Sequence, residues 1–300
     1  MAKTLKSLES EKTFASGAVS TRRSNARYRR QASQTLLFTV LTVILALSFV
    51  TIILMIFLSL KDNGQIYGRF WSLPDPVRWG NYRDSWIVMR RYIFNSLLYS
   101  LTSVVGVVFL SSLSGYVFAR HTFPGKELIY VLILALLMVP GVLTLIPAFV
   151  LVRDLHLLNT PWALILPWTA GGQVFGILLC RSFFATLPQE LFDAAKVDGA
   201  NEFQLYARIA LPLSWPILVT LSIMHLVSTY NDFIWPLLTI SDQKTQVVTV
   251  GLTQFRNEFG TVNWGPRMAA YGVASLPLVI LFSFGMRYYV RGLTSGALKG

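Results

Sequence analysis

One acidic residue lies inside the long apolar runs of this 300-residue chain, and it has polar and aromatic neighbours. Asp232 follows Tyr230 and Asn231, and Trp235 comes three residues later. A carboxylate in an apolar medium is costly and usually faces a cavity or a partner. Carboxylates accept hydrogen bonds from hydroxyl groups and aromatic rings offer apolar faces, so this cluster could line a path for a sugar. Alternatively, Asp232 caps or pairs locally near a membrane interface.

Residues for covalent catalysis or metal binding are not grouped in the sequence. The histidines His121, His156 and His225 are scattered, and the single cysteine, Cys180, permits no intramolecular disulfide. No nucleophile has a base at a useful spacing, and no G-x-x-x-x-G-K-[ST] phosphate cradle occurs. Any nucleotide chemistry must therefore reside on another chain.

A second informative stretch, TLPQELFDAAKVDGANEFQLYARIALPLSWP, occupies residues 186–216. Pro188 is suited to the start of a helix, and Asp198-Gly199 is typical of a turn. Asn201 can then cap a second short helix. This pattern predicts two short helices joined by a bend, a knob that could enter a groove on a partner. The alternative is an ordinary pair of interfacial helices.

The elements that must position these residues follow from composition. Apolar residues make up 54% of the chain and charged residues only 13%, about half the fraction typical of soluble domains. The net charge of +12 could indicate nucleic-acid binding in a soluble protein. Here the charges lie between long uncharged runs, which favours a membrane protein with basic residues at the helix ends and near lipid head groups, and no nucleic-acid partner.

Six runs are long enough to cross a bilayer, so we predict an all-α polytopic membrane protein with six transmembrane helices. Ser111 and Gly115 in the second run have a spacing that lets helices approach closely. Prolines in later runs predict packing kinks, with gating hinges as the alternative. The predicted spans are 36–60, 92–119, 128–152, 157–180, 209–240 and 268–286.

The distribution of basic residues predicts the orientation of these spans. Sixteen Lys and Arg lie on the side of the termini and ten on the other, which places both termini in the cytoplasm. Residues 1–35, with eight basic residues, are predicted to be a largely disordered cytoplasmic tail rather than a signal peptide.

Four motifs give these features a family context. The run D-A-A-x-x-D-G-A beginning at Asp193, followed by I-x-L-P, resembles the EAA loop of permease subunits of binding-protein-dependent ABC importers. Asp193 stands where that family has Glu. The stretch YNDFIWPL resembles a pattern of carbohydrate permeases, with Tyr230 in place of Trp. RYIFNSLLYS, with Asn95, and the ending G-x-x-x-G-A-x-K-G resemble the maltose-type "G subunit".

The resemblance implies a domain plan and a set of functional residues. It implies a first helix at 36–60, a permease core of five helices at 92–290, a cytoplasmic coupling loop at 186–212 and a C-terminal tail at 291–300. The residues expected to couple to the ATPase are Glu190, Asp193, Ala194, Ala195, Asp198, Gly199, Ala200 and Phe203. The residues expected along the translocation path are Asn95, Tyr230, Asn231, Asp232 and Trp235.

The resemblance also implies partners. They are a second permease, two copies of an ATPase that binds ATP and magnesium, and an extracytoplasmic solute-binding protein, all serving sugar import across a bacterial inner membrane. The loop 241–267 would face outside, with Gln254, Arg256, Asn257 and Trp264 as contacts to the binding protein. The alternative for these four residues is a solvated loop.

The sequence supports two other function classes less well, and its charges bear on the class of sugar. A membrane enzyme such as a glycosyl transferase would need grouped carboxylates, and only Asp232 lies in a span. A channel or scaffold would not explain the bend at Asp198-Gly199. The external loops carry ten basic and six acidic residues, a net charge of +4, which favours an anionic saccharide by long-range attraction. Basic residues at helix ends would give the same count.

Overall fold

The structure is a computed structural model that describes residues 34–255 and 262–297, and every regular element within them is a helix. The chain forms two compact units, Met1–Phe57 and Leu58–Gly300. The first contains most of an uncharged helix, Gln34–Ser59, and most of the apolar side chains of this helix are exposed. The tail predicted at residues 1–35 lies almost wholly outside the described residues.

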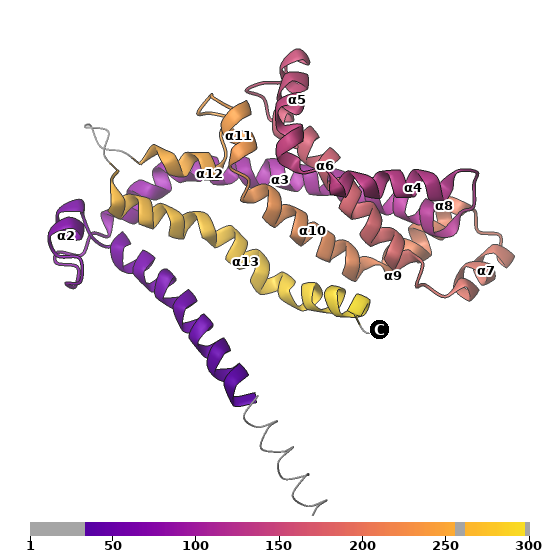
Figure 1. The fold of residues 1–300 in the computed structure, drawn as a ribbon, viewed down its shortest axis with the longest axis horizontal. Coiled ribbons are helices and arrows are strands. Elements are labelled where there is room, and N and C mark those ends of the chain that lie inside the picture. Colours follow the sequence, from indigo (N-terminus) through magenta and orange to yellow (C-terminus); the bar gives the residue numbers. More distant parts are fainter. Residues whose placement is uncertain (1–33, 256–261, 298–300) are drawn as a thin grey trace, which may run out of the picture. The chain divides into compact units, whose positions relative to one another are not determined.

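The second unit holds the remaining helices (Figure 1). The elements are α2 (Asn63–Gly68), α3 (Gly80–Arg120), α4 (Lys126–Ala135), η1 (Leu136–Met138), α5 (Gly141–Asp154), α6 (Trp162–Phe184), α7 (Gln189–Val197), α8 (Glu202–Leu205), η2 (Tyr206–Ala210), α9 (Leu211–Leu213), α10 (Trp215–Tyr230), α11 (Ile234–Thr239), α12 (Val248–Gly251), η3 (Leu252–Gln254) and α13 (Trp264–Ala297).

The described residues contain four helices long and apolar enough to cross a membrane, or up to six if two bent pairs each count as one span. The four are Gln34–Ser59, α3, α6 and the part of α13 that ends at Gly285. The chain is therefore a polytopic helical membrane protein. α3 begins well before the predicted start at Tyr92, and α13 continues to Ala297, into the segment predicted as a tail.

The two bent pairs fall where prolines interrupt apolar runs. Lys126–Met138 and Gly141–Asp154 meet at 100° around Pro140, and Glu202–Leu213 and Trp215–Tyr230 meet at 73° beside Ser214. Proline has no amide hydrogen and its ring clashes with the preceding turn, which explains breaks at these places. The third and fifth predicted spans are thus broken helices.

Small residues bring α3 and α6 into close contact, as their spacing predicted. A Cβ added at Gly115 would lie 2.5 Å from Cβ of Cys180, and one added at Gly176 would overlap Ser111. The hydroxyl of Ser111 donates to Oε1 of Gln173 at 2.9 Å. Small residues and interhelical hydrogen bonds are the usual means of helix association in lipid, where burial from water provides no driving force between helices.

The packed helices give the second unit two distinct ends. α7 and α8 lie at one end, which we call the α7 end, and α2, α11 and α12 lie at the other, which we call the α12 end (Figure 1). α3, α6 and α13 run from the α12 end toward the α7 end, and α10 runs back.

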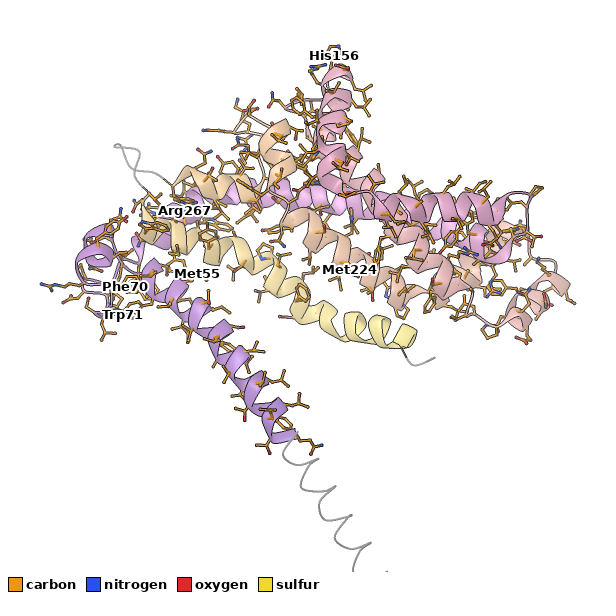
Figure 2. The ribbon with its side chains drawn as sticks, viewed as in Figure 1. Met55, Phe70, Trp71, His156, Met224 and Arg267 are labelled. Carbon is orange, nitrogen blue, oxygen red and sulfur yellow. The ribbon has the colours of Figure 1, made fainter. Side chains whose placement is uncertain are left out.

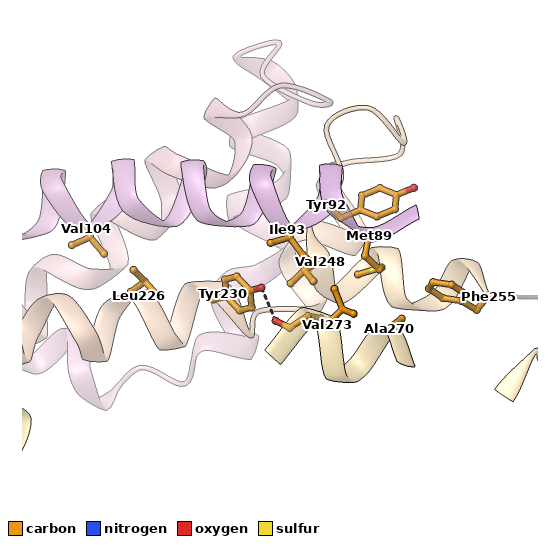
Figure 3. Close-up of a cluster of buried hydrophobic side chains, with 11 residues drawn as sticks. Met89, Tyr92, Ile93, Val104, Leu226, Tyr230, Val248, Phe255, Ala270 and Val273 are labelled. Carbon is orange, nitrogen blue, oxygen red and sulfur yellow. Dashed lines mark hydrogen bonds between the residues drawn. The ribbon is translucent and has the colours of Figure 1, made fainter. Parts of the chain in front are cut away.

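A buried cluster joins α3, α10 and α13 near the α12 end (Figure 3). It includes Met89 and Ile93 of α3, Leu226 and Tyr230 of α10, and Val273 of α13. The hydroxyl of Tyr230 donates to the carbonyl oxygen of Ala274 at 2.8 Å, so this ring is satisfied within the core.

Candidate functional site

The loop after α6 has the predicted bend, and its backbone explains the bend. Gly199 has φ of +85°, a conformation that side-chain-bearing residues rarely adopt. Its amide donates to the carbonyl of Lys196, and the amide of Ala200 donates to the carbonyl of Ala195 at 2.9 Å. These two bonds form a Schellman motif, which satisfies the last carbonyls of α7 and redirects the chain.

The second short helix begins immediately after this motif. The side chain of Asn201 accepts from the amide of Gln204 at 2.9 Å, and the side chain of Gln204 accepts from the amide of Asn201 at 2.9 Å. This reciprocal capping box satisfies amides that a helix start leaves without partners. The capping role predicted for Asn201 is therefore confirmed.

Apolar side chains are exposed around this bend. Val197 is 88% exposed and Phe203 is 73% exposed, and Leu191 is also exposed. Among the other residues expected to couple to the ATPase, Ala195 and Ala200 are partly buried and the rest are exposed; these are Glu190, Asp193, Ala194, Asp198 and Gly199. Apolar groups gathered on one surface, rimmed by polar ones, are typical of a protein interaction site.

Arg120, the last residue of α3, fixes the other face of α7. Its guanidinium donates to Oε1 of Gln189 at 2.8 Å and to the carbonyl oxygen of Leu187 at 2.6 Å. The same group lies 4.2 Å from the ring centroid of Phe192, which is almost fully buried beside Tyr116. Arg120 therefore links the start of α7 directly to the end of the long helix α3.

Nearer the α12 end, a cavity of about 570 Å³ opens between α6 and α10. Aromatic side chains from α6 and polar side chains from α10 line it, and Met224, labelled in Figure 2, marks its position on α10. The full lining is Pro167, Trp168, Gly171, Gly172, Phe175, Leu221, Met224, His225, Ser228, Thr229 and Asp232.

Asp232 and Trp168 form a hydrogen-bonded pair at the edge of this cavity. The indole nitrogen of Trp168 donates to Oδ2 of Asp232 at 2.7 Å, and the amide of Trp235 donates to Oδ1 at 3.4 Å. A second cavity of about 410 Å³, beside α5 and α11, is also lined by Trp168 and Asp232. The pair is thus shared by two adjoining cavities.

Polar groups tie the cavity wall to α3. His225 Nε2 lies 2.8 Å from the hydroxyl of Ser103, which also accepts from Thr169 at 3.2 Å. A Cβ on Gly172 would lie 2.7 Å from His225 and from Val107, so only glycine lets these helices meet here. The histidine is thereby held between α3, α6 and α10.

The structure gives the other predicted path residues different surroundings. Asn95 donates to the carbonyls of Lys244 and Gln246, both at 2.9 Å, and Tyr230 is bonded in the core as described. The exposed Asn231 donates to the carbonyl of Val227 at 2.8 Å, and Trp235 lines the smaller cavity. The described linings of both cavities therefore include Asp232 but neither Asn95 nor Tyr230.

The residues expected to contact a binding protein are placed only in part. Gln254 is exposed at the α12 end, whereas Arg256 and Asn257 lie outside the described residues. The amide of Trp264 donates to Oδ1 of Asn63 at 2.9 Å, and its indole donates to the hydroxyl of Tyr67 at 2.7 Å. Trp264 is therefore attached to α2 as well as starting α13.

Sequence reasoning missed three residues that the structure makes prominent: Trp168, His225 and Arg120. Each had an ordinary interpretation in one dimension. A tryptophan or a histidine in an apolar run suggests packing, and an arginine at a span's end suggests membrane orientation. The glycine pair at 171–172 was the one available signal of a close contact beside an open space. Among the described residues, no group of His, Cys, Asp and Glu could hold a metal ion.

Known proteins match the part of the chain that contains both the α7–α8 bend and the cavity between α6 and α10. Residues 108–295 match the family model described as "Binding-protein-dependent transport system inner membrane component". A probable ABC transporter permease protein of Bacillus subtilis, YurM, is 36% identical over 82% of this chain and 82% of its own length. The trehalose/maltose transport system permease protein MalG of Thermococcus litoralis is 34% identical over 70% of this chain and 75% of its own length.

A solved structure has the same fold. A chain of a bacterial ABC transporter involved in the import of the acidic polysaccharide alginate superposes with a TM-score of 0.74 at 21% identity. The match covers 85% of this chain and 95% of that one. At this level of identity the likeness concerns the fold alone.

Proposed function

Because the chain belongs to the family of inner membrane components of binding-protein-dependent transport systems, we propose that it forms one permease half of an ATP-driven sugar importer. It is a transport subunit of the inner membrane, not an enzyme. The energy would come from ATP, bound with magnesium on a partner ATPase, and would reach this chain through residues 186–212.

The observation that carries this proposal is the self-contained bend between α7 and α8. The Schellman motif at Gly199 and the capping box at Asn201 fix its shape, and Phe203 and Val197 remain exposed on it. Buried aromatic side chains are common energetic centres of protein interfaces. An exposed phenylalanine on a rigid knob fits a groove on an ATPase, and Arg120 would pass the movement of α7 to α3.

The two ends of the second unit would lie on opposite sides of the membrane. We assign the α7 end to the cytoplasm, supported by the sixteen basic residues predicted on that side. α13 runs toward the α7 end, which supports a cytoplasmic C-terminus. The N-terminus is assigned to the same side on the charge pattern alone.

The α12 end would then meet the solute-binding protein. Gln254 and Trp264 are the described residues proposed for this contact, together with Arg256 and Asn257 from the sequence. A second permease would complete the pathway, and two ATPase copies would bind the pair. The proposed cargo is a sugar or oligosaccharide, because the Thermococcus litoralis relative is named for trehalose and maltose.

The test is a charge placed on the knob. Phe203→Asp puts a carboxylate at a position that is 73% exposed, so folding should be unaffected. In the complex purified with its second permease and ATPase, we expect the ATPase to bind at least about tenfold more weakly, since a central aromatic is often worth about 2 kcal/mol or more. Sugar-stimulated ATP hydrolysis should fall with it.

The matched control is Trp71→Asp. Trp71 is 81% exposed in the segment between α2 and α3 at the opposite end, beyond the reach of a cytoplasmic ATPase. It should leave ATPase association unchanged. Equal retention of the ATPase by Phe203→Asp and Trp71→Asp would show that the α7–α8 bend is only an interfacial helix pair.

A further inference from the structure

We propose that the cavity between α6 and α10 is a saccharide subsite on this chain, and that Asp232 within it selects uncharged sugars over anionic ones. This inference rests on the proposed function and specifies the class of cargo. It also reassigns Asp232 from a general path residue to the residue that sets charge selectivity.

The cavity has the size and the lining that a sugar ring requires. Its volume of about 570 Å³ lies within the roughly 300–1,000 Å³ of small-molecule sites. Trp168 and Phe175 supply aromatic surface on the α6 side, and Ser228 supplies a hydroxyl on the α10 side. A Cβ on Gly171 would meet nothing within 4 Å, so the space beside it is open.

Asp232 retains acceptor capacity for a ligand. A carboxylate offers about four acceptor positions. The indole of Trp168 and the amide of Trp235 occupy two of them, one on each oxygen. The remaining positions can accept hydrogen bonds from sugar hydroxyls, which are donors. A uronate carboxylate is acceptor-only and cannot donate to Asp232.

Electrostatics strengthen this discrimination. The described lining of the cavity contains no Lys or Arg that would neutralise Asp232 or attract a uronate. Two like charges about 4 Å apart repel strongly even in a partly polar medium, so an anionic ring should bind at least about tenfold more weakly than a neutral one. The positive external loops would still draw anions toward the mouth, and the cavity would reject them.

Site-specific labelling measures occupancy of the cavity directly. Ser228→Cys places a thiol in the lining, and Cys180 can stay because it is fully buried. In the assembled complex in nanodiscs, without binding protein, maltotriose and raffinose should slow labelling of the new thiol. Trigalacturonate at the same concentrations should not. Protection by neither neutral sugar, or equal protection by trigalacturonate, would overturn the subsite.

The decisive variant removes the charge and keeps the shape. Asp232→Asn retains an oxygen for the indole of Trp168. With it, the concentration of trigalacturonate needed for protection should fall at least about tenfold, because the like-charge repulsion is gone. The concentrations of maltotriose and raffinose needed for protection should change less than about threefold. If the ratio of the trigalacturonate concentration to the neutral-sugar concentration needed for protection is unchanged, Asp232 serves only to hold Trp168 and the start of α11.

A second variant tests whether the open space beside Gly171 is needed for sugar binding. Gly171→Leu adds a large side chain to the open part of the cavity, where a Cβ would meet nothing within 4 Å. Ala170→Leu places the same side chain on an exposed neighbour outside the lining. Gly171→Leu should lose protection by sugars and most sugar uptake, and Ala170→Leu should keep both. Stimulation of ATP hydrolysis by the loaded binding protein should survive in both variants.

The outcomes separate this inference from the proposed function. If the wild-type importer responds to sugar but Asp232→Asn and Gly171→Leu behave like wild type, the subsite is wrong and the importer stands. If no sugar stimulates ATP hydrolysis by the wild-type complex, the proposed function itself fails.

Discussion

The two ends of the helical unit are built by different means. At the α7 end, the bend depends on residues that are neighbours in sequence: the Schellman motif closes within α7 and the residues after it, and the capping box spans Asn201 to Gln204. At the α12 end, asparagine side chains hold segments that are far apart in sequence. Asn95 holds Lys244 and Gln246, and Asn63 holds Val262 and Trp264.

Two further asparagines repeat this arrangement at the α12 end. Asn81 donates to the carbonyls of Ser59 and Lys61, both at 2.8 Å, and Oδ1 of Asn159 accepts from the amide of Ser241 at 2.6 Å. The two ends should therefore respond differently to a partner. A bend fixed by local hydrogen bonds can move as a rigid unit, whereas the long-range hydrogen bonds at the α12 end hold its segments in place.

The largest effect is expected at the bend. Gly199→Val places a β-branched residue at φ of +85°, which costs about 1–2 kcal/mol or more and must distort the bend. Sugar-stimulated ATP hydrolysis by the reconstituted complex should fall by about tenfold or more. Gly125→Val is the matched control, because Gly125 has φ of +78° and precedes a different helix, α4. Equal losses in both variants would show that backbone strain, not the shape of this bend, causes the defect.

The next effect tests the cross-bracing. Asn95→Ala leaves the buried carbonyl of Gln246 without this donor, at a cost of about 1–3 kcal/mol, while the carbonyl of Lys244 still accepts from Arg91. The midpoint of thermal inactivation should fall by several degrees, and the segment 240–247 should exchange its amides faster. Asn231→Ala removes an exposed, local bond to Val227 and should shift the midpoint little. If the two variants are equally stable, long-range bracing by Asn95 contributes nothing.

A smaller effect is expected where the bend meets α3. Arg120→Lys removes the paired donors to Gln189 and Leu187 and the stacking on Phe192. Transport per ATP hydrolysed should fall by roughly three- to tenfold, corresponding to about 1 kcal/mol. Arg181→Lys is the control: Arg181 binds Glu127 at 2.9 Å and stacks on Tyr130, joining α6 to α4 instead. If Arg120→Lys leaves the amount of sugar transported per ATP hydrolysed unchanged, Arg120 does not transmit the movement of α7 to α3.

The smallest effect concerns acid pH and the α12 end. The amide of Gln65, with a further contribution from the Arg78 ion pair, holds the pKa of Asp62 below its usual value. A lowered folded-state pKa stabilises the fold above the unfolded pKa, and that contribution disappears as pH falls through the folded value. The protection of the α2 amides from hydrogen exchange, relative to their intrinsic exchange rates, should therefore fall only below about pH 4. Asp62→Asn should remove this pH dependence; its persistence would assign the transition to another group.

These contrasts explain what sequence alone could predict. The bend at Gly199 and the cap at Asn201 were predicted because their determinants are contiguous, and the membrane-spanning character followed from composition. Trp168 and Asp232 are 64 residues apart, and no local pattern indicates that their side chains meet. Asn95 was expected along the path because RYIFNSLLYS resembles the maltose-type family, and nothing in that stretch indicates its partners Lys244 and Gln246, about 150 positions away.

The adjacent glycines of α6 have a consequence for how such a transporter can diversify. Gly172 has no room for a methyl group, because His225 and Val107 lie against it, whereas Gly171 has empty space beside it. Substitutions at residue 171 would therefore fill the cavity one carbon at a time while the packing of the helices stays intact, and under the proposed function they would alter which sugars fit. At residue 172 the same substitutions would force His225 and Val107 to move. Residue 171 can therefore accept a larger side chain, whereas residue 172 must stay glycine for these helices to pack as they do.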